Sequence, residues 1–144
     1  MTFSNDKNKI FIDTNVLIGA FAPGKKNEEE KKCWKYVCSL TGKKLFVSSL
    51  SVAQFVSVFQ RKMEQADVAK HVRTILSKAT IVEFSEKDIE KSLSIEGHDM
   101  EDNMQYVLSQ KMRCGILITQ NKKDYVNYLN VDVIRAKEHR TINQ

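Results

Sequence analysis

Residues 9–21 of the chain read KIFIDTNVLIGAF, and the apolar run Ile10-Phe11-Ile12 ends abruptly at Asp13. Consecutive large apolar residues are typical of a strand that is buried on both faces, as in a parallel sheet covered by helices. A carboxylate has no use inside such a strand, so Asp13 indicates either a turn or a site at the carboxyl end of the strand. The apolar residues behind it predict a short helix over 16–21.

Compact runs rich in Ile, Val and Phe recur along the chain, and longer stretches with helical spacing separate them. The predicted strands are 9–13, 44–48, 80–84, 115–119 and 131–135, and the predicted helices are 16–21, 28–40, 52–63, 66–78, 86–95 and 101–113. Strands that alternate with helices predict an α/β fold, a three-layer α/β/α sandwich around a central, mainly parallel five-stranded sheet.

Length and composition predict one globular domain over residues 1–144, because 42% of the residues are hydrophobic and 28% are charged. The formal net charge is +5, which favours an anionic partner such as nucleic acid. The three cysteines include no zinc-like CxxC pair, and a reduced set of this kind is typical of the cytoplasm. The N-terminus has no signal-peptide pattern, and no apolar run approaches the ~20 residues that cross a bilayer. We therefore expect no membrane-spanning segment and no membrane partner.

Polar side chains fall where two predicted strands end. Asp13 ends the first strand, and Asn121 and Asp124 follow the fourth, while Asp99 and Asp102 lie at the start of the helix that leads into the fourth strand. Ligands bind beyond the carboxyl ends of the strands in open parallel sheets. We therefore expect these groups, which are remote in sequence, to converge on one edge of the sheet.

A purely structural interpretation exists for each group taken alone. Asp99 and Asp102 have the spacing of an N-cap and an N3 residue, Asn121 and Asp124 repeat that spacing, and Asp13 suits an Asx-type turn. Capping does not explain, however, why three such features fall at one edge.

Carboxylates gathered at one place repel one another, and their pKa values rise unless a cation compensates. Oxygen ligands from Asp and Asn suit Mg²⁺ or Mn²⁺ much better than zinc. A divalent ion held in this way can activate a water and stabilise charge on a phosphodiester. Together with the basic net charge, the pattern predicts a metal-dependent nuclease.

The stretches FIDTNVLI, DMEDNMQY and LITQNKKDY, in this order and spacing, resemble the PIN domain family, especially bacterial toxins of the VapC type. The resemblance spans residues 9–135. It implies an Mg²⁺- or Mn²⁺-dependent endoribonuclease, the toxin of a toxin–antitoxin pair. It also implies a homodimer that a small antitoxin protein neutralises.

The resemblance assigns roles to individual residues. Asp13, Asp102, Asn121 and Asp124 are the expected metal ligands, and the expected catalytic acids are Asp13, Asp102, Asp124 and Asp99. Of these, Asp99 is expected either to orient the attacking water or to lie behind the direct metal ligands and support them. Thr14 and Asn15 are expected to support Asp13, while Lys111, Arg113, Lys122 and Lys123 are candidate contacts for RNA phosphates.

One position departs from the family pattern. Many members carry Glu in the first turn of the helix after the second strand, whereas this chain has Gln54 in the sequence SSLSVAQF. An amide keeps an oxygen but loses a full charge, so we expect weaker metal binding. The alternative is a catalytically weakened PIN-like module that binds RNA or a protein partner without cleaving RNA.

Overall fold

The computed structural model describes residues 5–96, 99–122 and 128–143. Five strands form one sheet in the order β3-β2-β1-β4-β5, and every neighbouring pair is parallel. The predicted parallel α/β sheet is therefore confirmed. The strands are β1 (Asp6–Ile12), β2 (Lys44–Ser48), β3 (Ala79–Val82), β4 (Cys114–Ile118) and β5 (Asp132–Ile134).

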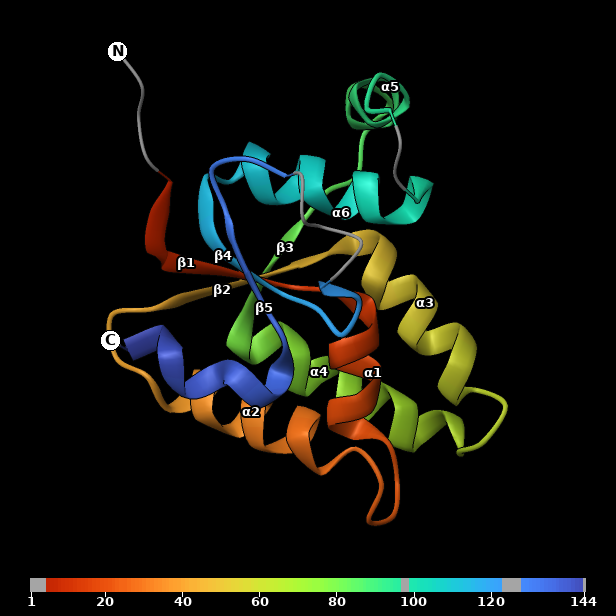
Figure 1. The fold of residues 1–144 in the computed structure, drawn as a ribbon. Coiled ribbons are helices and arrows are strands. Elements are labelled where there is room, and N and C mark those ends of the chain that lie inside the picture. The colour runs from red at the N-terminus through yellow and green to blue at the C-terminus, as the bar shows by residue number, and fades with distance from the viewer. Residues whose placement is uncertain (1–4, 97–98, 123–127, 144) are drawn as a thin grey trace.

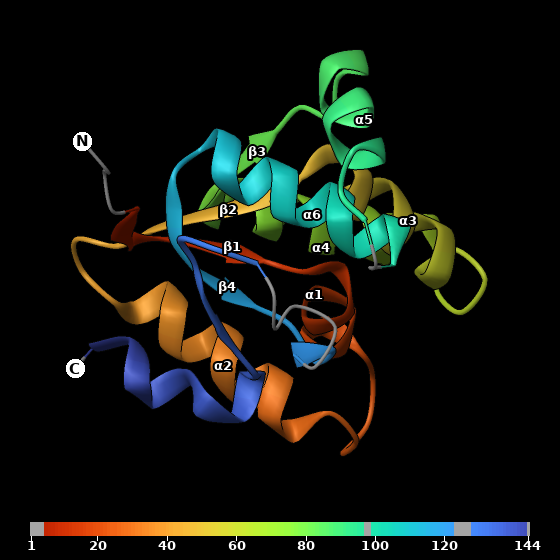
Figure 2. The same cartoon turned by 45° about the horizontal axis from the view of Figure 1, so that its top comes forward.

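Helices cover both faces of the sheet, as Figure 1 shows, so the three-layer arrangement is confirmed too. One layer contains α1 (Thr14–Phe21), α2 (Glu28–Ser39), α3 (Ser49–Phe59), α4 (Gln65–Lys78) and the 3₁₀ helix η2 (Ala136–Asn143). The other layer contains α5 (Glu86–Leu93) and α6 (Met100–Lys111), which pack against each other in Figure 2.

The central strand β1 buries both of its faces. Ile10 and Ile12 belong to the apolar cluster formed with α1 to α4, whereas Phe11 packs on the opposite side with Leu108 of α6. All of these side chains are at most 1% exposed. Burial on both faces explains why the apolar run in the sequence is continuous rather than alternating.

Local capping explains why several helices begin earlier than the sequence pattern predicts. Helix α1 starts at Thr14 because Asp13 is its N-cap and accepts a hydrogen bond from the Thr14 N–H. Helix α3 starts at Ser49 because the Ser48 side chain accepts from the Ser51 N–H. The sequence pattern did not predict η2, which is polar along much of its length.

Close approach of β1 and β4 depends on Gly115. A Cβ at this position would lie 2.7 Å from the backbone carbon of Asp6 and from the backbone nitrogen of Lys7. Only glycine avoids this clash, so Gly115 allows the two central strands to pair beside the irregularity at the start of β1.

All three cysteines are free. Burial explains why two of them have protonated, unreactive thiols. Removal from water raises the pKa of Cys33 and of Cys114 to about 12. These two thiols stay protonated at neutral pH and act as small apolar side chains. Across the described residues, none of the helices is both long and apolar enough to cross a bilayer.

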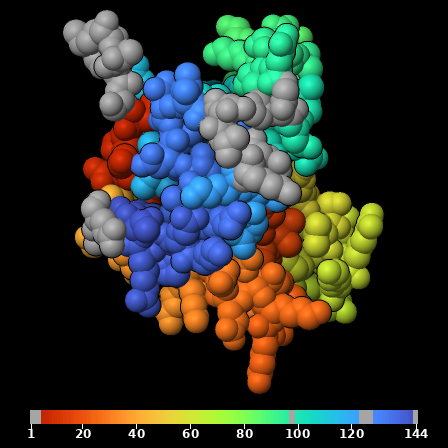
Figure 3. Space-filling view, viewed as in Figure 1, coloured from red at the N-terminus to blue at the C-terminus, as the bar shows by residue number. Residues whose placement is uncertain are grey.

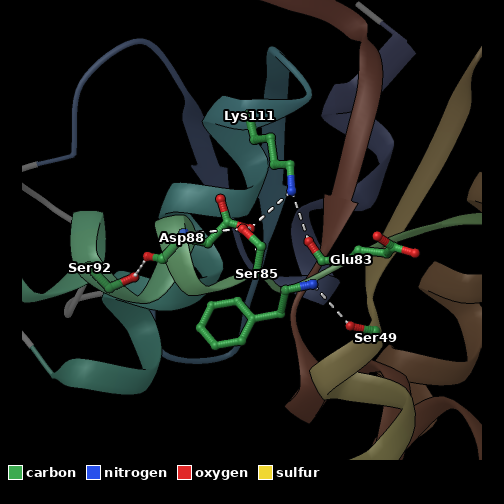
Figure 4. A network of polar contacts seen from close by, with 7 residues as sticks. Ser49, Glu83, Ser85, Asp88, Ser92 and Lys111 are labelled. Atoms are coloured by element: carbon green, nitrogen blue, oxygen red, sulfur yellow. Dashed lines mark hydrogen bonds and ion pairs between the residues drawn. The ribbon is translucent and has the colours of Figure 1, made fainter.

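A buried carboxylate, Asp88, joins α5 to α6 (Figure 4). The Lys111 ammonium lies 2.9 Å from Asp88 Oδ2 and also donates to the carbonyl of Glu83 at 2.9 Å. The backbone N–H and hydroxyl of Ser85 donate to the same carboxylate oxygen. Lys111 is thus engaged within the protein, and the RNA contact expected for it from the sequence stays a prediction.

Burial opposes ionisation of Asp88, but the hydrogen bonds from Ser85 and the charge of Lys111 outweigh it. The pKa of this carboxyl group is therefore lower than its ordinary value. A group with a lowered folded-state pKa stabilises the fold above its unfolded-state pKa, and this contribution is lost as the pH falls through the folded-state value.

Asp88→Asn keeps the shape of the side chain and removes its charge. We expect the free energy of unfolding to fall by about 1–3 kcal/mol at neutral pH, since hydrogen bonds to charged groups contribute about this much. Urea denaturation at about pH 7 and about pH 2 should show the gap between wild type and variant narrowing in acid. Glu90→Gln, on the exposed side of the same helix, is the control. An equal gap at both pH values would contradict the ionised pairing.

Candidate functional site

Asp13 lies where the order of the strands reverses, between β1 and β4. Its backbone N–H donates to the carbonyl of Ile118 at 2.9 Å, which continues the pairing of the two strands. The hydroxyl of Thr119 donates to Asp13 Oδ2 at 2.6 Å, and the Thr14 N–H donates to Oδ1 at 2.7 Å. The carboxylate is thus oriented at the position where parallel sheets bind their ligands.

A pocket of about 390 Å³ opens beside this carboxylate. Figures 1 and 2 show the helices that enclose it, α1, α3 and the first turn of α6, at the same edge of the sheet. Six of the residues selected from the sequence line the pocket: Asp13, Thr14, Asn15, Gln54, Asp102 and Asn121. Asp13 and Asp102 are only 5% and 7% exposed, so the pocket holds two buried carboxylates.

Two predicted acids are not among the described residues that line the pocket. Asp99 is the N-cap of α6, where its carboxylate accepts from the backbone N–H groups of Glu101 and Asp102 at 2.9 and 3.2 Å. The described lining of the pocket does not include Asp99, so its observed contacts match the capping interpretation. Asp124 lies outside the described residues.

Sequence reasoning missed three residues of the site: Glu101, Gln105 and Ser51. Glu101 and Gln105 line the pocket. Gln105 follows Glu101 by four residues and Asp102 by three, which places all of them on one face of α6. This spacing was readable in DMEDNMQY and could have predicted Glu101 and Gln105 as residues of the site.

Gln105 connects α6 to α1 and α3 beneath the pocket. Its side-chain amide donates to the Thr14 hydroxyl at 2.9 Å and to the Ser51 hydroxyl at 2.8 Å. Thr14 in turn donates to Gln54 Oε1 at 2.8 Å. The oxygen of Gln54 is thus an acceptor within this polar network.

Gln105 is 3% exposed, and its Oε1 is buried with no hydrogen-bond partner among the described residues. A buried acceptor left in this state costs about 1–3 kcal/mol. An unmet acceptor beside a polar pocket indicates that a donor belongs there, either a water or a group of a ligand.

The segment after β4 that carries Asn121 is held from three sides. Asn15 Oδ1 accepts from the Gln120 N–H at 3.2 Å, and the Gln120 amide group bonds both Glu30 of α2 and the N–H of Ala136 in η2. Glu30 packs against Gly19, where a Cβ would lie 2.7 Å from Glu30 Cγ. Asn15 therefore acts here on the loop that carries Asn121.

The described residues suit a hard divalent cation. The pocket has the carboxylates of Asp13, Asp102 and Glu101 and the amide of Asn121 along its lining, and none of its described lining residues is His or Cys. Within the described ranges, no group of three or more His, Cys, Asp or Glu could hold a metal by itself. Mg²⁺ is commonly held by one or two carboxylates with several waters, so this donor set fits it and does not fit zinc.

Ser51→Ala tests the polar network below the pocket. Ser51 is fully buried and contacts Thr14, Ser48 and Gln105, so its removal leaves polar partners unsatisfied. We expect the free energy of unfolding to fall by about 1–3 kcal/mol. Ser57→Ala, on the exposed side of the same helix, should change it by less than about 0.5 kcal/mol in the same urea titration. Equal losses in the two variants would contradict the network.

Comparison with known proteins agrees with the resemblance seen in the sequence. A family model for the PIN domain matches residues 9–123. Ribonuclease VapC1 of Aquifex aeolicus (strain VF5) is 24% identical over 140 residues, which cover 90% of this chain and 92% of that protein.

Solved structures share the fold. A toxin–antitoxin complex from Klebsiella pneumoniae contains a chain that matches with a TM-score of 0.66 and 20% identity, over 88% of this chain and 97% of that chain. VapC20 of Mycobacterium tuberculosis, a toxin that cleaves the sarcin–ricin loop, matches with a TM-score of 0.63 and 11% identity, over 85% and 98% of the two chains. By the family match across most of its length, the chain belongs to the PIN domain family.

Proposed function

We propose that this protein is a metal-dependent endoribonuclease that hydrolyses RNA phosphodiester bonds. The observation that carries the proposal is the convergence of the buried carboxylates of Asp13 and Asp102 with Asn121 in one pocket, at the carboxyl edge of a parallel sheet. The likeness to a ribonuclease along most of the chain supports the same reaction.

Asp13, Asp102 and Asn121 would hold Mg²⁺ or Mn²⁺, and Asp124 completes the set that we propose from the sequence. The bound cation would supply a more acidic water and would stabilise charge on the phosphodiester. The contacts from Thr14 and Thr119 fix the direction of the Asp13 carboxylate before any ligand arrives. This preorganisation lowers the cost of gathering like charges around one ion.

The two acids at the start of α6 have different tasks in this proposal. Asp99 begins the helix and thereby sets the position of Asp102, because it accepts from the backbone N–H of Asp102. Glu101 lines the pocket and is exposed, so its carboxylate is better placed than that of Asp99 to accept a proton from the attacking water.

We further propose that the protein is one domain that acts in the cytoplasm as the toxin of a toxin–antitoxin pair, as a homodimer with a small antitoxin partner. The Klebsiella pneumoniae chain of the same fold belongs to a toxin–antitoxin complex. Large apolar side chains exposed on α4 and α5, Leu76 at 53% and Leu93 at 60%, offer surface for such contacts.

Asp13→Asn and Asp102→Asn test the reaction directly. Each variant removes one ligand charge, and we expect at least a ~100-fold loss of Mn²⁺-dependent cleavage of single-stranded RNA, a typical effect of removing one stabilising group from an active site. Asp132→Asn, which changes an exposed carboxylate on β5, should cleave like wild type. Cleavage is followed by gel electrophoresis with Mn²⁺, with Mg²⁺ and with EDTA. Full activity of Asp102→Asn would overturn the assignment.

Gln54→Glu tests the departure from the family pattern. The new carboxylate can accept the same hydrogen bond from Thr14 and adds a negative charge to the pocket lining. We expect the Mn²⁺ concentration for half-maximal cleavage to fall about tenfold, as a gain of about 1.4 kcal/mol in ion binding would give. Cleavage by this variant but not by wild type would favour the alternative, a PIN module that binds RNA or a protein without cutting.

A further inference from the structure

A second, basic cleft of about 680 Å³ lies between α2 and η2. The two elements run side by side in Figure 1, and their surfaces adjoin in the space-filling view of Figure 3. The cleft is lined by Lys32, Lys35, Tyr36, Ser39, His139 and Arg140. None of these residues belongs to the pocket beside Asp13.

The described lining of this cleft is cationic. Lys32, Lys35 and Arg140 are exposed, and no Asp or Glu is among the described residues that line it. The ion pairs of the described part of the chain join Lys7 to Asp132, Lys111 to Asp88 and Lys122 to Glu138, so they use none of the cations of the cleft. A concave surface with positive charge of this kind attracts a polyanion.

Two rings lie in the same cleft. The rings of Tyr36 and His139 have their centres 5.0 Å apart at an angle of 51°. His139 Nδ1 lies 2.8 Å from the carbonyl of Ala136, and since the carbonyl can only accept, Nδ1 carries the hydrogen and the ring is fixed. Cations beside oriented aromatic rings are the combination that binds single-stranded nucleic acid through phosphates and stacked bases.

The two elements that form the cleft also hold the loop that carries Asn121. Gln120, which precedes Asn121, bonds Glu30 of α2 and the N–H of Ala136 in η2. Tyr36 follows Glu30 by six residues, so Tyr36 lies about 9 Å farther along the axis of α2. The cleft and the loop that carries Asn121 are therefore joined through the same two elements, α2 and η2.

We propose that the α2–η2 cleft is a second binding site for single-stranded RNA, which holds the substrate through its backbone and one stacked base while the pocket acts on the scissile bond. The inference rests on the proposed ribonuclease function. The phosphates contact Lys32, Lys35 and Arg140, and a base stacks on the Tyr36–His139 pair. The substrate is thus a strand long enough to occupy both places.

The test compares two charge-matched variants of the full chain. Lys32→Ala/Lys35→Ala removes two cations from the cleft, and Lys87→Ala/Lys91→Ala removes two exposed lysines from α5 in the opposite layer. Fluorescence anisotropy in EDTA measures binding of labelled single-stranded RNAs of about 4 and about 16 nucleotides, without cleavage. Thermal melting followed by circular dichroism checks that both variants fold.

We expect the cleft variant to bind the long RNA about tenfold more weakly and to reduce the slope of log K against log salt by about 1.4, or 0.7 for each lost phosphate contact. The short RNA makes fewer phosphate contacts, so it should bind wild type more weakly than the long RNA does and should lose less affinity in the cleft variant. Tyr36→Leu should weaken binding of the long RNA with no change in the salt slope, because it removes stacking and no charge.

Equal losses in the cleft variant and the α5 variant would overturn the proposal, because they would show a general effect of charge. Unchanged binding of the long RNA by the cleft variant would also overturn it, even if wild type cleaves RNA. Selective loss in the cleft variant supports the site whether or not cleavage occurs. Failure of the proposed function itself appears separately, as the absence of Mn²⁺-dependent cleavage by wild type.

Discussion

The fixed carboxylate of Asp13 is the constraint on which the rest of the site depends. Each of its oxygens accepts a hydrogen bond, one from the helix that follows β1 and one from the residue that follows β4. The strand order reverses between β1 and β4. The chain segments that follow these two strands therefore run in opposite directions from this point. The edge of the sheet therefore stays open here, and a carboxylate can be oriented without being sealed in the core.

Helix α6 buries polar side chains that the site uses. It buries Asp102, Asn103, Gln105 and Ser109 along with its apolar residues, so its apolar stripe is poorly defined. Most of these groups are satisfied by specific partners, as with Gln105 on Thr14 and Ser51 and Asn103 on Ile95 and Tyr128. The unmet Oε1 of Gln105 is the exception, and it lies at the pocket where the proposed reaction needs polar groups.

The sequence predicted the layers of the fold because burial on both faces leaves uninterrupted apolar runs, as in Ile10 to Ile12. It placed Asp13, Asp102 and Asn121 near one another because parallel strands bring their carboxyl ends to one edge. It could not separate capping from catalysis at Asp99, since the same side chain suits both. Partners such as Asp88 for Lys111 and Gln105 for Thr14 arise from tertiary packing, and η2 has no strong apolar period.

The separation of charges has a physical reason within the proposed function. RNA is a polyanion and the pocket is lined by carboxylates, so the pocket alone would repel its substrate. Lysines placed among those carboxylates would attract RNA but would compete with the divalent ion for the same oxygens. Cations on α2 and η2 avoid that competition and still act on the same strand, because both elements are bonded to the loop beside Asn121. In this proposal the same two elements thus carry the basic site for the RNA and hold the loop beside the acidic site.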